Sequence, residues 1–309
     1  MNWPALIADI GGTNARFAIL SGPGANTSQQ RNLINADYAS LADAIRTYCA
    51  LENIAPKRAA IAAAGPQKNG IFKLTNLPQW DVPITDLCAE LGFHEIKVLN
   101  DFEALALSLP HLQRQDLFSL KPLAQGEKGQ ALAVIGPGTG LGVGAVIKTP
   151  SGWQAIPSEG GHVELGNRHA ELAHWLDLVR ERFGRVSAER ILCGKGFALL
   201  HELMSGEKLD PAEVGSQALA GNAKARATAQ AFLSLLASLA GDMALVYGAR
   251  GGVFIGGGII TKLVPLIDAE AFKADFKAKG RLEPYLDPLP LHIITNPVPA
   301  LIGCAASLE

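Results

Sequence analysis

The sequence predicts a duplicated α/β fold in which two α/β domains stand on either side of a cleft. Residues 6–20 form an apolar run broken by two glycines, a threonine and an asparagine, which is typical of two strands joined by a tight turn. Residues 133–147 repeat this plan, and a cluster of three glycines follows the later apolar run 252–255. Two such hairpins, about half a chain apart, indicate an internal duplication.

The turn of the first hairpin has the composition of a phosphate site. Gly11 and Gly12 let backbone N–H groups approach a ligand closely, and Thr13 and Asn14 add short polar donors. Asp9 ends an apolar strand, where a carboxylate is costly unless it is paired or near a metal. The turn therefore suits a phosphate chain that carries Mg²⁺. For a single motif of this kind, an ordinary hairpin with a turn-capping aspartate is the slightly favoured alternative.

The second hairpin changes that balance in favour of a nucleotide. Gly138 and Thr139 match Gly12 and Thr13, and Gly140 follows them. Two phosphate hairpins indicate a nucleotide between the two halves of the chain. The later glycine cluster, a candidate adenosine motif, consists of Gly256, Gly257 and Gly258. This order of motifs resembles the superfamily of sugar kinases, Hsp70 and actin.

Size and composition agree with a soluble cytoplasmic protein of two domains. The 309 residues are 48% hydrophobic, which supports a core in each domain. The net charge of −2 argues against binding to nucleic acid or to an anionic membrane. Four widely spaced cysteines lack zinc spacing and are expected to be buried free thiols. The N-terminus lacks signal-peptide features, and the uncharged stretch 131–147 is too rich in glycine for a membrane helix.

The first domain is predicted to hold residues 1–110 together with 295–309. A helix is expected where Leu41, Ile45 and Tyr48 recur at helical spacing. The other expected elements are a polar loop at 21–30, strands at 33–38, 58–64, 71–75 and 96–99, a turn at 64–66, and helices at 82–91 and 102–109, the last one halted by Pro110.

The second domain is predicted to hold residues 111–294, beginning with a polar segment at 113–129. The clearest helix covers 223–247, with one apolar stripe formed by Phe232, Leu236, Leu239, Met243 and Val246. Further expected elements are strands at 153–156, 253–255 and 291–294, helical character from residue 170, and a tail helix that ends at Leu308 and packs on the first domain.

Asn100 and Asp101 are the best catalytic candidates. They follow the strand at 96–99, and ligands of open α/β sheets bind beyond the carboxyl ends of strands. A phosphoryl acceptor is an alcohol, whose proton an adjacent carboxylate can take. Asp101 is also placed to cap the following helix, which is the structural alternative. With two phosphate hairpins in the chain we favour catalysis, and one residue can serve both purposes.

The segment Glu159-Gly160-Gly161-His162 is a candidate sugar loop. Sugar hydroxyls pair with carboxylates and imidazoles, and the two glycines would bring both side chains onto a small ligand. An exposed polar loop is the alternative. A metal site is disfavoured because His162 and Glu164 supply too few ligands. His169 and His174 are explained by a solvated helix face.

Two common nucleotide motifs are missing from the sequence. Gly194-Lys195 is followed by glycine, so the GxxxxGK[ST] pattern is absent, and no GxGxxG follows a strand. The chain is therefore neither a P-loop enzyme nor an obvious Rossmann dehydrogenase.

Taken together, the motifs resemble those of bacterial glucokinases over nearly the whole chain. In chain order they are Asp9-Ile10-Gly11-Gly12-Thr13-Asn14-Ala15-Arg16, Leu99-Asn100-Asp101-Phe102, Gly136-Pro137-Gly138-Thr139-Gly140-Leu141-Gly142, Glu159-Gly160-Gly161-His162, Ser187-Ala188-Glu189-Arg190-Ile191-Leu192-Cys193-Gly194 and Gly256-Gly257-Gly258. The resemblance implies ATP-dependent phosphorylation of glucose at its 6-hydroxyl, the entry step of glycolysis. It also implies a homodimer, a cleft that closes on glucose, and sugar contacts from Asn100, Asp101, Glu159, His162 and Glu189, with Asp101 as general base.

Departures from the family pattern are small. Cys193 stands where serine is common and Gly256 where alanine is common, and the zinc-binding cysteine cluster of the related ROK proteins is absent. Without the resemblance, Glu189 would be taken for an exposed helix residue.

Two other classes of protein compete with the kinase. A sugar-sensing repressor would need an added helix-turn-helix, but the first hairpin begins within ten residues of Met1. Actin-type or Hsp70-type ATPases are longer and do not need the sugar loop. The residues remain compatible with glucose, mannose or glucosamine as the sugar, and with ATP, ADP or polyphosphate as the donor.

Overall fold

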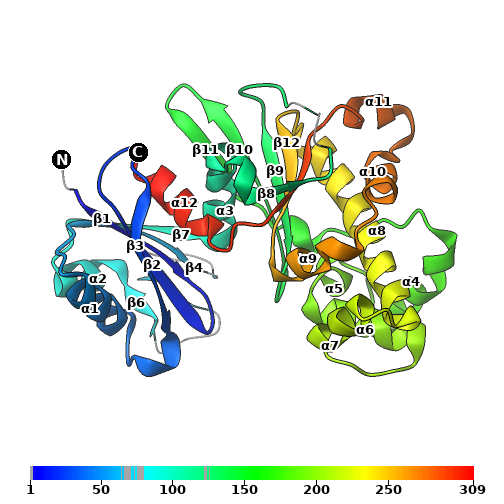
Figure 1. Cartoon of the computed structure of the whole chain (residues 1–309), viewed down its shortest axis with the longest axis horizontal. Helices are drawn as coiled ribbons and strands as arrows, with labels where there is room; N and C mark the ends of the chain where they lie inside the picture. Colours follow the sequence, from blue (N-terminus) through cyan, green and yellow to red (C-terminus); the bar gives the residue numbers. More distant parts are fainter. Residues whose placement is uncertain are drawn as a thin grey trace. The chain divides into compact units, whose positions relative to one another are not determined.

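The computed structural model divides the chain into two compact units, shown in Figure 1. Unit 1 comprises Met1–Leu112 and Pro297–Glu309, and unit 2 comprises Gln113–Asn296. The structure describes residues 3–63, 65, 71–72, 74, 80–121, 124 and 126–309. The turn predicted at 64–66 lies largely outside the described residues; of the strand predicted at 71–75, residues 71, 72 and 74 are described, and 71–72 form a strand.

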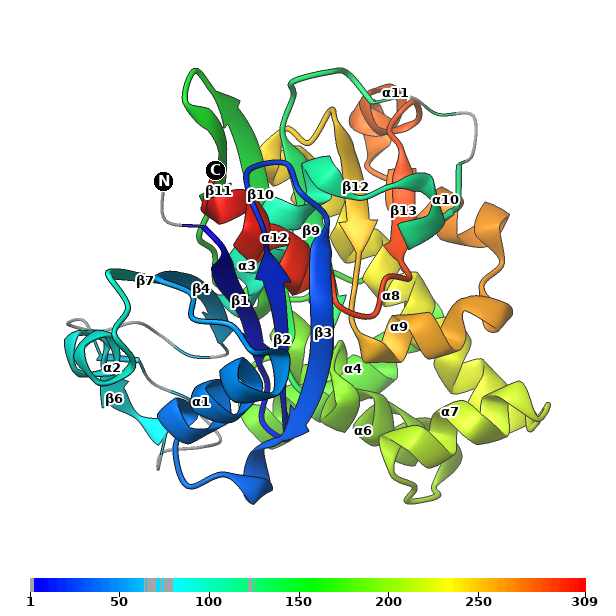
Figure 2. The ribbon, with the colours of Figure 1, turned by 60° about the vertical axis from the view of Figure 1, so that its left-hand side comes forward.

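The sheet of unit 1 has the strand order β3-β2-β1-β4-β7. β1 pairs antiparallel with β2 and parallel with β4, which pairs parallel with β7. Figure 2 shows β1, β2 and β3 side by side, with α1 and α2 on the face opposite α12. The strands are β1 (Ala5–Ile10), β2 (Asn14–Leu20), β3 (Thr27–Ile34), β4 (Arg58–Ala63) and β7 (Glu95–Asn100), and β5 (Ile71–Phe72) pairs separately with β6 (Val82–Pro83).

Helices cover both faces of this sheet and create its core. The helices are α1 (Leu41–Glu52), α2 (Ile84–Leu91), α3 (Asp101–Ser108) and α12 (Pro299–Ser307). Leu41, Ile45 and Tyr48 of α1 are buried against alternate residues of β1, which confirms the predicted helix. On the other face α12 packs on α3, and the Cys304 thiol donates to the carbonyl oxygen of Ala8 at 3.4 Å. The tail helix therefore returns to unit 1 as predicted.

The sheet of unit 2 repeats the plan of unit 1, with the order β11-β10-β9-β12-β13-β8. β9 pairs antiparallel with β10 and parallel with β12, as β1 does with β2 and β4. This shared pattern confirms the predicted duplication. The strands are β8 (Leu117–Ser119), β9 (Leu132–Pro137), β10 (Leu141–Thr149), β11 (Gly152–Ile156), β12 (Gly252–Ile255) and β13 (Leu291–Ile294).

The core of unit 2 is organised around the long helix α8 (Ala223–Tyr247), whose bounds match the prediction. In the described part of the chain, α8 is the one helix long and apolar enough to cross a membrane, but 72% of its most apolar window is buried inside unit 2. Its apolar side chains therefore already have packing partners. The other helices are α4 (Ala170–Phe183), α5 (Ala188–Ile191), α6 (Gly194–Ser205), α7 (Pro211–Leu219), α9 (Gly258–Leu263), α10 (Ala269–Lys277) and α11 (Glu283–Leu286).

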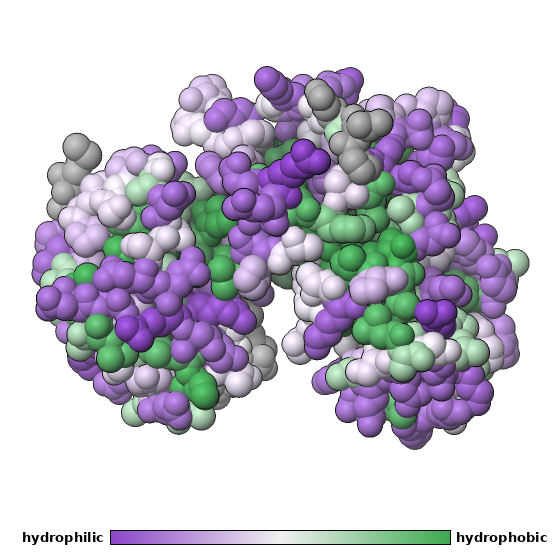
Figure 3. Space-filling model, viewed as in Figure 1, coloured by the Kyte–Doolittle hydropathy of each residue, from purple (hydrophilic) through white to green (hydrophobic). Residues whose placement is uncertain are grey.

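The surface visible in Figure 3 is mostly hydrophilic over each unit, with smaller hydrophobic patches. Within α8, Val246 belongs to this surface because it is 68% exposed. The predicted apolar stripe is thus correct for its other members, and wrong for this residue in the last turn.

Three of the predicted elements are placed wrongly. β3 occupies 27–34, so it begins within the predicted polar loop 21–30 and overlaps the strand predicted at 33–38 only at 33–34, and residues 35–37 form a 3₁₀ turn instead of a strand. β8 lies in the predicted polar segment 113–129. Both are edge strands, and exposed edge strands lack a clear apolar pattern. The helix predicted at 82–91 begins at Ile84, because residues 82–83 pair with β5.

Substitution of Gly303 will test the packing of α12 on α3. A Cβ atom there would lie 1.7 Å from the carbonyl oxygen of Ala104, so Gly303→Ala must push the two backbones apart. Overpacking of this kind costs roughly 1–3 kcal/mol, and we expect a clear fall in the Tm measured by circular dichroism. Gly215 of α7 is the control, because nothing lies within 4 Å of its Cβ position. Gly215→Ala should leave the Tm unchanged or raise it, and equal effects of the two changes would contradict the packing.

Candidate active site

The parallel strands of unit 1 bring two predicted site segments to one edge of the sheet. Ile10 of β1 is in register with Ala63 of β4, and Ala63 is in register with Asn100 of β7. Neighbouring strands lie about 4.8 Å apart, so the ends of β1 and β7 are roughly 10 Å apart. The first hairpin turn therefore leaves the sheet at the same edge as Asn100 and Asp101.

The turn after β1 is held by Asn35, a residue that the sequence analysis missed. Its backbone N–H donates to the Thr13 carbonyl at 2.9 Å, and its Nδ2 donates to the Gly11 carbonyl at 2.8 Å. Asn35 is 2% exposed, and its position five residues after the end of the predicted polar loop offered no signal in the sequence. With both carbonyls engaged, the turn is fixed in one conformation.

The donors predicted for this turn are not all available to a ligand. The Gly11 N–H donates to the Asn14 carbonyl at 2.9 Å, which closes the turn. The Asn14 side-chain oxygen accepts from Asn32 at 2.9 Å, which directs that side chain toward β3. Gly12 and Thr13 are therefore the better candidates for phosphate contact, and Gly11 and Asn14 shape the turn.

Asp9 carries its charge in a largely buried position beside the turn. Arg16, its cross-strand partner on β2, donates from Nη1 to Oδ2 of Asp9 at 3.0 Å. Burial raises the pKa of Asp9, and the Arg16 guanidinium opposes that rise. The ion pair explains how the carboxylate is tolerated there, and it leaves the second oxygen of Asp9 for another ligand.

Asn100, and not Asp101, caps helix α3. Its side-chain oxygen accepts from the Phe102 N–H at 2.9 Å, and Glu103 completes a capping box by accepting from the Asn100 N–H at 3.3 Å. The alternative structural role considered for Asp101 was thus wrong by one residue. Asp101 is the first residue of α3, so its carboxylate is not needed as the cap.

The environment of Asp101 favours proton uptake. Burial raises the pKa of its carboxyl, the Phe102 N–H donating at 3.0 Å opposes the rise, and the charge of Asp9 adds to it. A carboxylate with a raised pKa binds a proton more readily than an exposed one, which is the property that a general base for an alcohol requires.

The second hairpin turn, between β9 and β10, is fastened on both sides. The Gly138 N–H donates to the Gly140 carbonyl at 2.8 Å, and the Gly138 carbonyl accepts from the Gly194 N–H at the start of α6 at 2.9 Å. The Leu141 N–H donates to Oε2 of Glu189 at 2.9 Å. This hydrogen bond ties Glu189 to the hairpin, and the side chain is half-buried, whereas without the family resemblance it would be taken for an exposed helix residue.

The glycine cluster after β12 lies directly against the same hairpin. The Gly256 N–H donates to the Ile135 carbonyl at 2.8 Å, and a Cβ on Gly257 would lie 2.4 Å from the Pro137 carbonyl oxygen. Gly257 also has φ +99°, a conformation that favours glycine. Gly258 starts α9, with open space where its Cβ would be. The structure thus places the two predicted nucleotide segments of unit 2 side by side.

The candidate sugar loop, residues 159–162, also packs closely against β10. A Cβ on Gly161 would lie 1.9 Å from the Leu141 carbonyl oxygen, so only glycine permits this approach. His162 follows, with Nδ1 3.9 Å from Oε1 of Glu189 and Nε2 3.9 Å from Oε2 of Glu159. Glu159 is 92% exposed at its side chain and His162 58%, so both can still accept a ligand.

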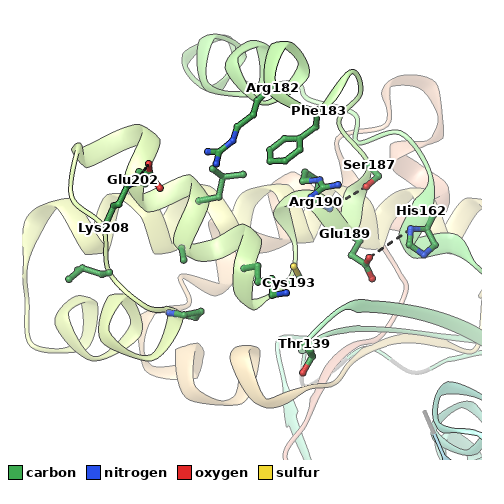
Figure 4. Close-up of a pocket in the computed structure, with 15 residues that line it drawn as sticks. Thr139, His162, Arg182, Phe183, Ser187, Glu189, Arg190, Cys193, Glu202 and Lys208 are labelled. Atoms are coloured by element: carbon green, nitrogen blue, oxygen red, sulfur yellow. Dashed lines mark hydrogen bonds and ion pairs between the residues drawn. The ribbon is translucent and has the colours of Figure 1, made fainter. Parts of the chain in front are cut away.

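Thr139, His162 and Glu189 line a cavity of about 770 Å³ in unit 2. Figure 4 shows Glu189 pointing toward His162 at one end, Thr139 below them, and Glu202 and Lys208 at the other end. Arg182 and Arg190 lie 5.2 and 4.1 Å from the ring centroid of Phe183 along the wall. The volume lies within the range of pockets that bind small molecules and cofactors.

The prediction that His169 lies on a solvated helix face is wrong. Its Nε2 lies 3.0 Å from Asp275 and 2.8 Å from Ser234, and Arg168 also pairs with Asp275, which ties the start of α4 to α8 and α10. Across the described residues, no group of three or more His, Cys, Asp or Glu side chains is arranged to hold a metal ion. All four cysteines are free, and Cys49 and Cys88 are only partly buried.

Comparisons with known proteins agree on one family. The family model described as Glucokinase matches residues 6–309. A glucokinase of Chromobacterium violaceum is 40% identical over 317 residues, which cover 99% of this chain and 89% of the relative. The crystal structure of a glucokinase from an Antarctic psychrotroph is 35% identical, with a TM-score of 0.91, and the match covers 99% of this chain and 98% of that one. The glucokinase of Balamuthia mandrillaris in complex with glucose shares the fold, at 19% identity and a TM-score of 0.78, over 98% and 92% of the two chains.

The raised pKa of Asp101 predicts a stability gain on its replacement. Below the ordinary pKa of an aspartate, about 3.9, both the folded and the unfolded chain carry the proton. Between about pH 3.9 and the pKa of Asp101 in the folded state, only the unfolded chain loses this proton, so the free energy of unfolding falls as the pH rises. Above the folded pKa both states have lost the proton, and the loss of stability stays constant. Asp101→Asn should therefore raise the Tm at pH 7.5, by an amount that shrinks as the pH falls through the folded pKa. Asp86→Asn, at an exposed position in α2, is the control and should give no gain, and an unchanged or lower Tm for Asp101→Asn would contradict the argument.

Proposed function

The chain belongs to the glucokinase family and is a sugar kinase, and on that premise we propose that it transfers the γ-phosphoryl group of ATP to the 6-hydroxyl of glucose at the entry of glycolysis. The family match runs from residue 6 to the C-terminus. A coupled assay with glucose and ATP tests the proposal directly, and glucose-dependent ADP formation is the expected result. ATP hydrolysis that glucose does not change would point to an ATPase instead.

The observation that carries this proposal is the cavity in unit 2. One cavity is lined both by Thr139, at the turn of a phosphate hairpin, and by His162 and Glu189, which are suited to sugar hydroxyls. A ligand site of this composition accommodates a sugar and the end of a phosphate chain close together. Glu159 belongs to the same loop as His162 and would add a further hydroxyl contact.

We assign the chemical step to Asp101 and the orientation of the sugar to Asn100. The cap hydrogen bond engages the side-chain oxygen of Asn100, and its amide also donates to Asp101, which leaves one amide N–H to donate to a sugar oxygen. Asp101 would accept the proton of the 6-hydroxyl as that oxygen forms its bond to phosphorus and the bond between phosphorus and the ADP oxygen breaks. The raised pKa of Asp101 suits this proton transfer.

The nucleotide would be bound through the two hairpin turns and the glycine cluster. We propose phosphate contacts at Gly12-Thr13 and at Gly138, Thr139 and Gly140, with adenosine near 256–258. Mg²⁺ would arrive with ATP and neutralise charge on the phosphates. Asp9, whose second oxygen Arg16 does not engage, would lie in or near the Mg²⁺ coordination shell. We further propose that the protein is a cytoplasmic homodimer, which size-exclusion chromatography with light scattering tests.

Substitution of Gly138 will test the phosphate hairpin. A Cβ at this position would meet only the Gly140 carbonyl, at 3.9 Å, so Gly138→Val should fold normally. The new side chain would stand where the phosphates pass, and we expect the KM for ATP to rise at least tenfold while glucose still binds. Gly22→Val, in open space after the end of β2 that lies opposite the turn, is the control. An unchanged KM for ATP in Gly138→Val would refute the assignment.

Substitution of Asp101 will test the general base. Asp101→Asn keeps size and hydrogen bonding but removes the charge and the basic oxygen. Loss of a general base costs on the order of 10²- to 10⁴-fold in rate, so kcat should collapse. Glucose affinity, measured by calorimetry, should fall far less, because the other sugar contacts remain. Turnover within a few-fold of the wild type would show that Asp101 is not the base.

A further inference from the structure

Glu189 lies where the sugar loop meets the phosphate hairpin, and we propose that it is a positioning residue that couples sugar binding to nucleotide binding. This inference rests on the proposed kinase function, but it assigns Glu189 a second role besides contact with the sugar. Its two carboxylate oxygens serve the two sides: Oε2 holds the hairpin, and Oε1 faces His162.

The contact on the hairpin side is close and specific. Oε2 accepts the hydrogen bond of the Leu141 N–H at 2.9 Å, and the same oxygen lies 2.6 Å from the place where a Cβ on Gly140 would be. The turn therefore approaches the carboxylate only because residue 140 has no side chain. A hydrogen bond to an ionised acceptor is roughly twice as strong as a neutral one, so Glu189 can fix the position of Gly140 and Leu141.

On the side that faces the sugar, Glu189 is connected directly to the sugar loop. Glu189 belongs to α5, whose first residue, Ala188, donates its N–H to the Val163 carbonyl at 2.8 Å, directly after the sugar loop. Oε1 stands 3.9 Å from Nδ1 of His162, and both residues line the cavity. Figure 4 shows the carboxylate turned toward the imidazole, above Thr139.

Other contacts do not replace this link. The hairpin is also held by the hydrogen bond from Gly194 to Gly138 and by the close approach of Gly161 to Leu141. Those contacts are made by backbone atoms, which a bound sugar does not move. Among the hydrogen bonds of the described residues, Glu189 supplies the side-chain contact to the turn.

The consequence is an energetic coupling between the two ligands. A sugar hydroxyl that donates to Oε1 holds the carboxylate in the orientation in which Oε2 holds Leu141, so the hairpin is ordered for phosphate before ATP arrives. By linkage, a nucleotide that needs the ordered hairpin strengthens glucose binding by the same factor. Couplings of this type typically amount to about 5- to 150-fold in affinity.

The test measures the affinity for AMPPNP by calorimetry, without glucose and with saturating glucose, and uses the ratio of the two dissociation constants. In the wild type we expect a ratio of about fivefold or more. Gly140→Ala adds one methyl group that displaces the flexible Glu189 carboxylate and leaves the fold intact, so its ratio should approach one. Gly215→Ala on α7 adds the same methyl group outside the proposed binding residues, where nothing lies within 4 Å of it, and should keep the wild-type ratio.

Glu189 itself provides the second variant pair. Glu189→Ala should lose the coupling together with glucose affinity, without a fall in Tm. Glu189→Gln can still accept from Leu141, so it should recover much of the coupling although its glucose affinity stays reduced. A merely structural role would lower the Tm and leave the ratio unchanged.

Two results would overturn the inference: a wild-type ratio of one with normal turnover, or a wild-type ratio retained in Gly140→Ala and Glu189→Ala. Failure of the proposed function would be seen separately, as a wild type that does not phosphorylate glucose.

Discussion

The register of the parallel strands is the constraint on which both parts of the site depend. In each unit the first strand pairs with an antiparallel neighbour on one side and a parallel strand on the other. The tight turn of the hairpin must then lie at the edge where the parallel strands end. In unit 1 the in-register residues Ile10, Ala63 and Asn100 define that edge. The hairpin turn and the strand-end side chains are therefore brought together by backbone hydrogen bonds before any side chain makes a contact.

In unit 2, close approaches between backbone atoms bring the site segments together, as the strand register does in unit 1. Gly161 lies against Leu141, Gly257 against Pro137, and Gly194 donates to Gly138. Three segments far apart in the sequence are thereby fastened to one turn. A Cβ at residue 161 or 257 would occupy the space of a carbonyl oxygen, so these contacts need glycine for steric reasons. The turn is rigid because its neighbours are backbone, and Glu189 adds the side-chain contact that a ligand can influence.

Two carboxylates of unit 1, those of Asp9 and Asp101, lower the stability of the fold unless their burial is compensated. Asp9 and Asp101 are both largely buried, and burial raises the pKa of each. Arg16 compensates Asp9, whereas Asp101 has mainly the Phe102 N–H to oppose its desolvation. A cap made by Asn100 and Glu103 stabilises the helix without help from Asp101. The fold thus tolerates an under-compensated carboxylate at the end of a strand, where a base for an alcohol would be useful.

The local sequence pattern determined those elements that are strongly apolar or bounded by clear turn residues. The two glycine hairpins, the long helix α8 and the strand before Asn100 follow from periodicity and turn residues, because burial imposes those patterns. The duplication could be predicted for the same reason, since both hairpins carry their own signature. Exposed edge strands β3 and β8 could not be predicted, because solvent imposes no pattern on them.

Only the tertiary structure decided which side chains meet. The role of Asn35 depends on a turn 24 residues away, that of His169 on Asp275, and that of Glu189 on a backbone N–H 48 residues away. Read alone, each is an ordinary polar residue, because a hydrogen bond between distant residues leaves no periodic trace in one sequence. The chemistry of the candidate site is thus visible in the motifs, whereas the contacts that hold it in place arise from packing.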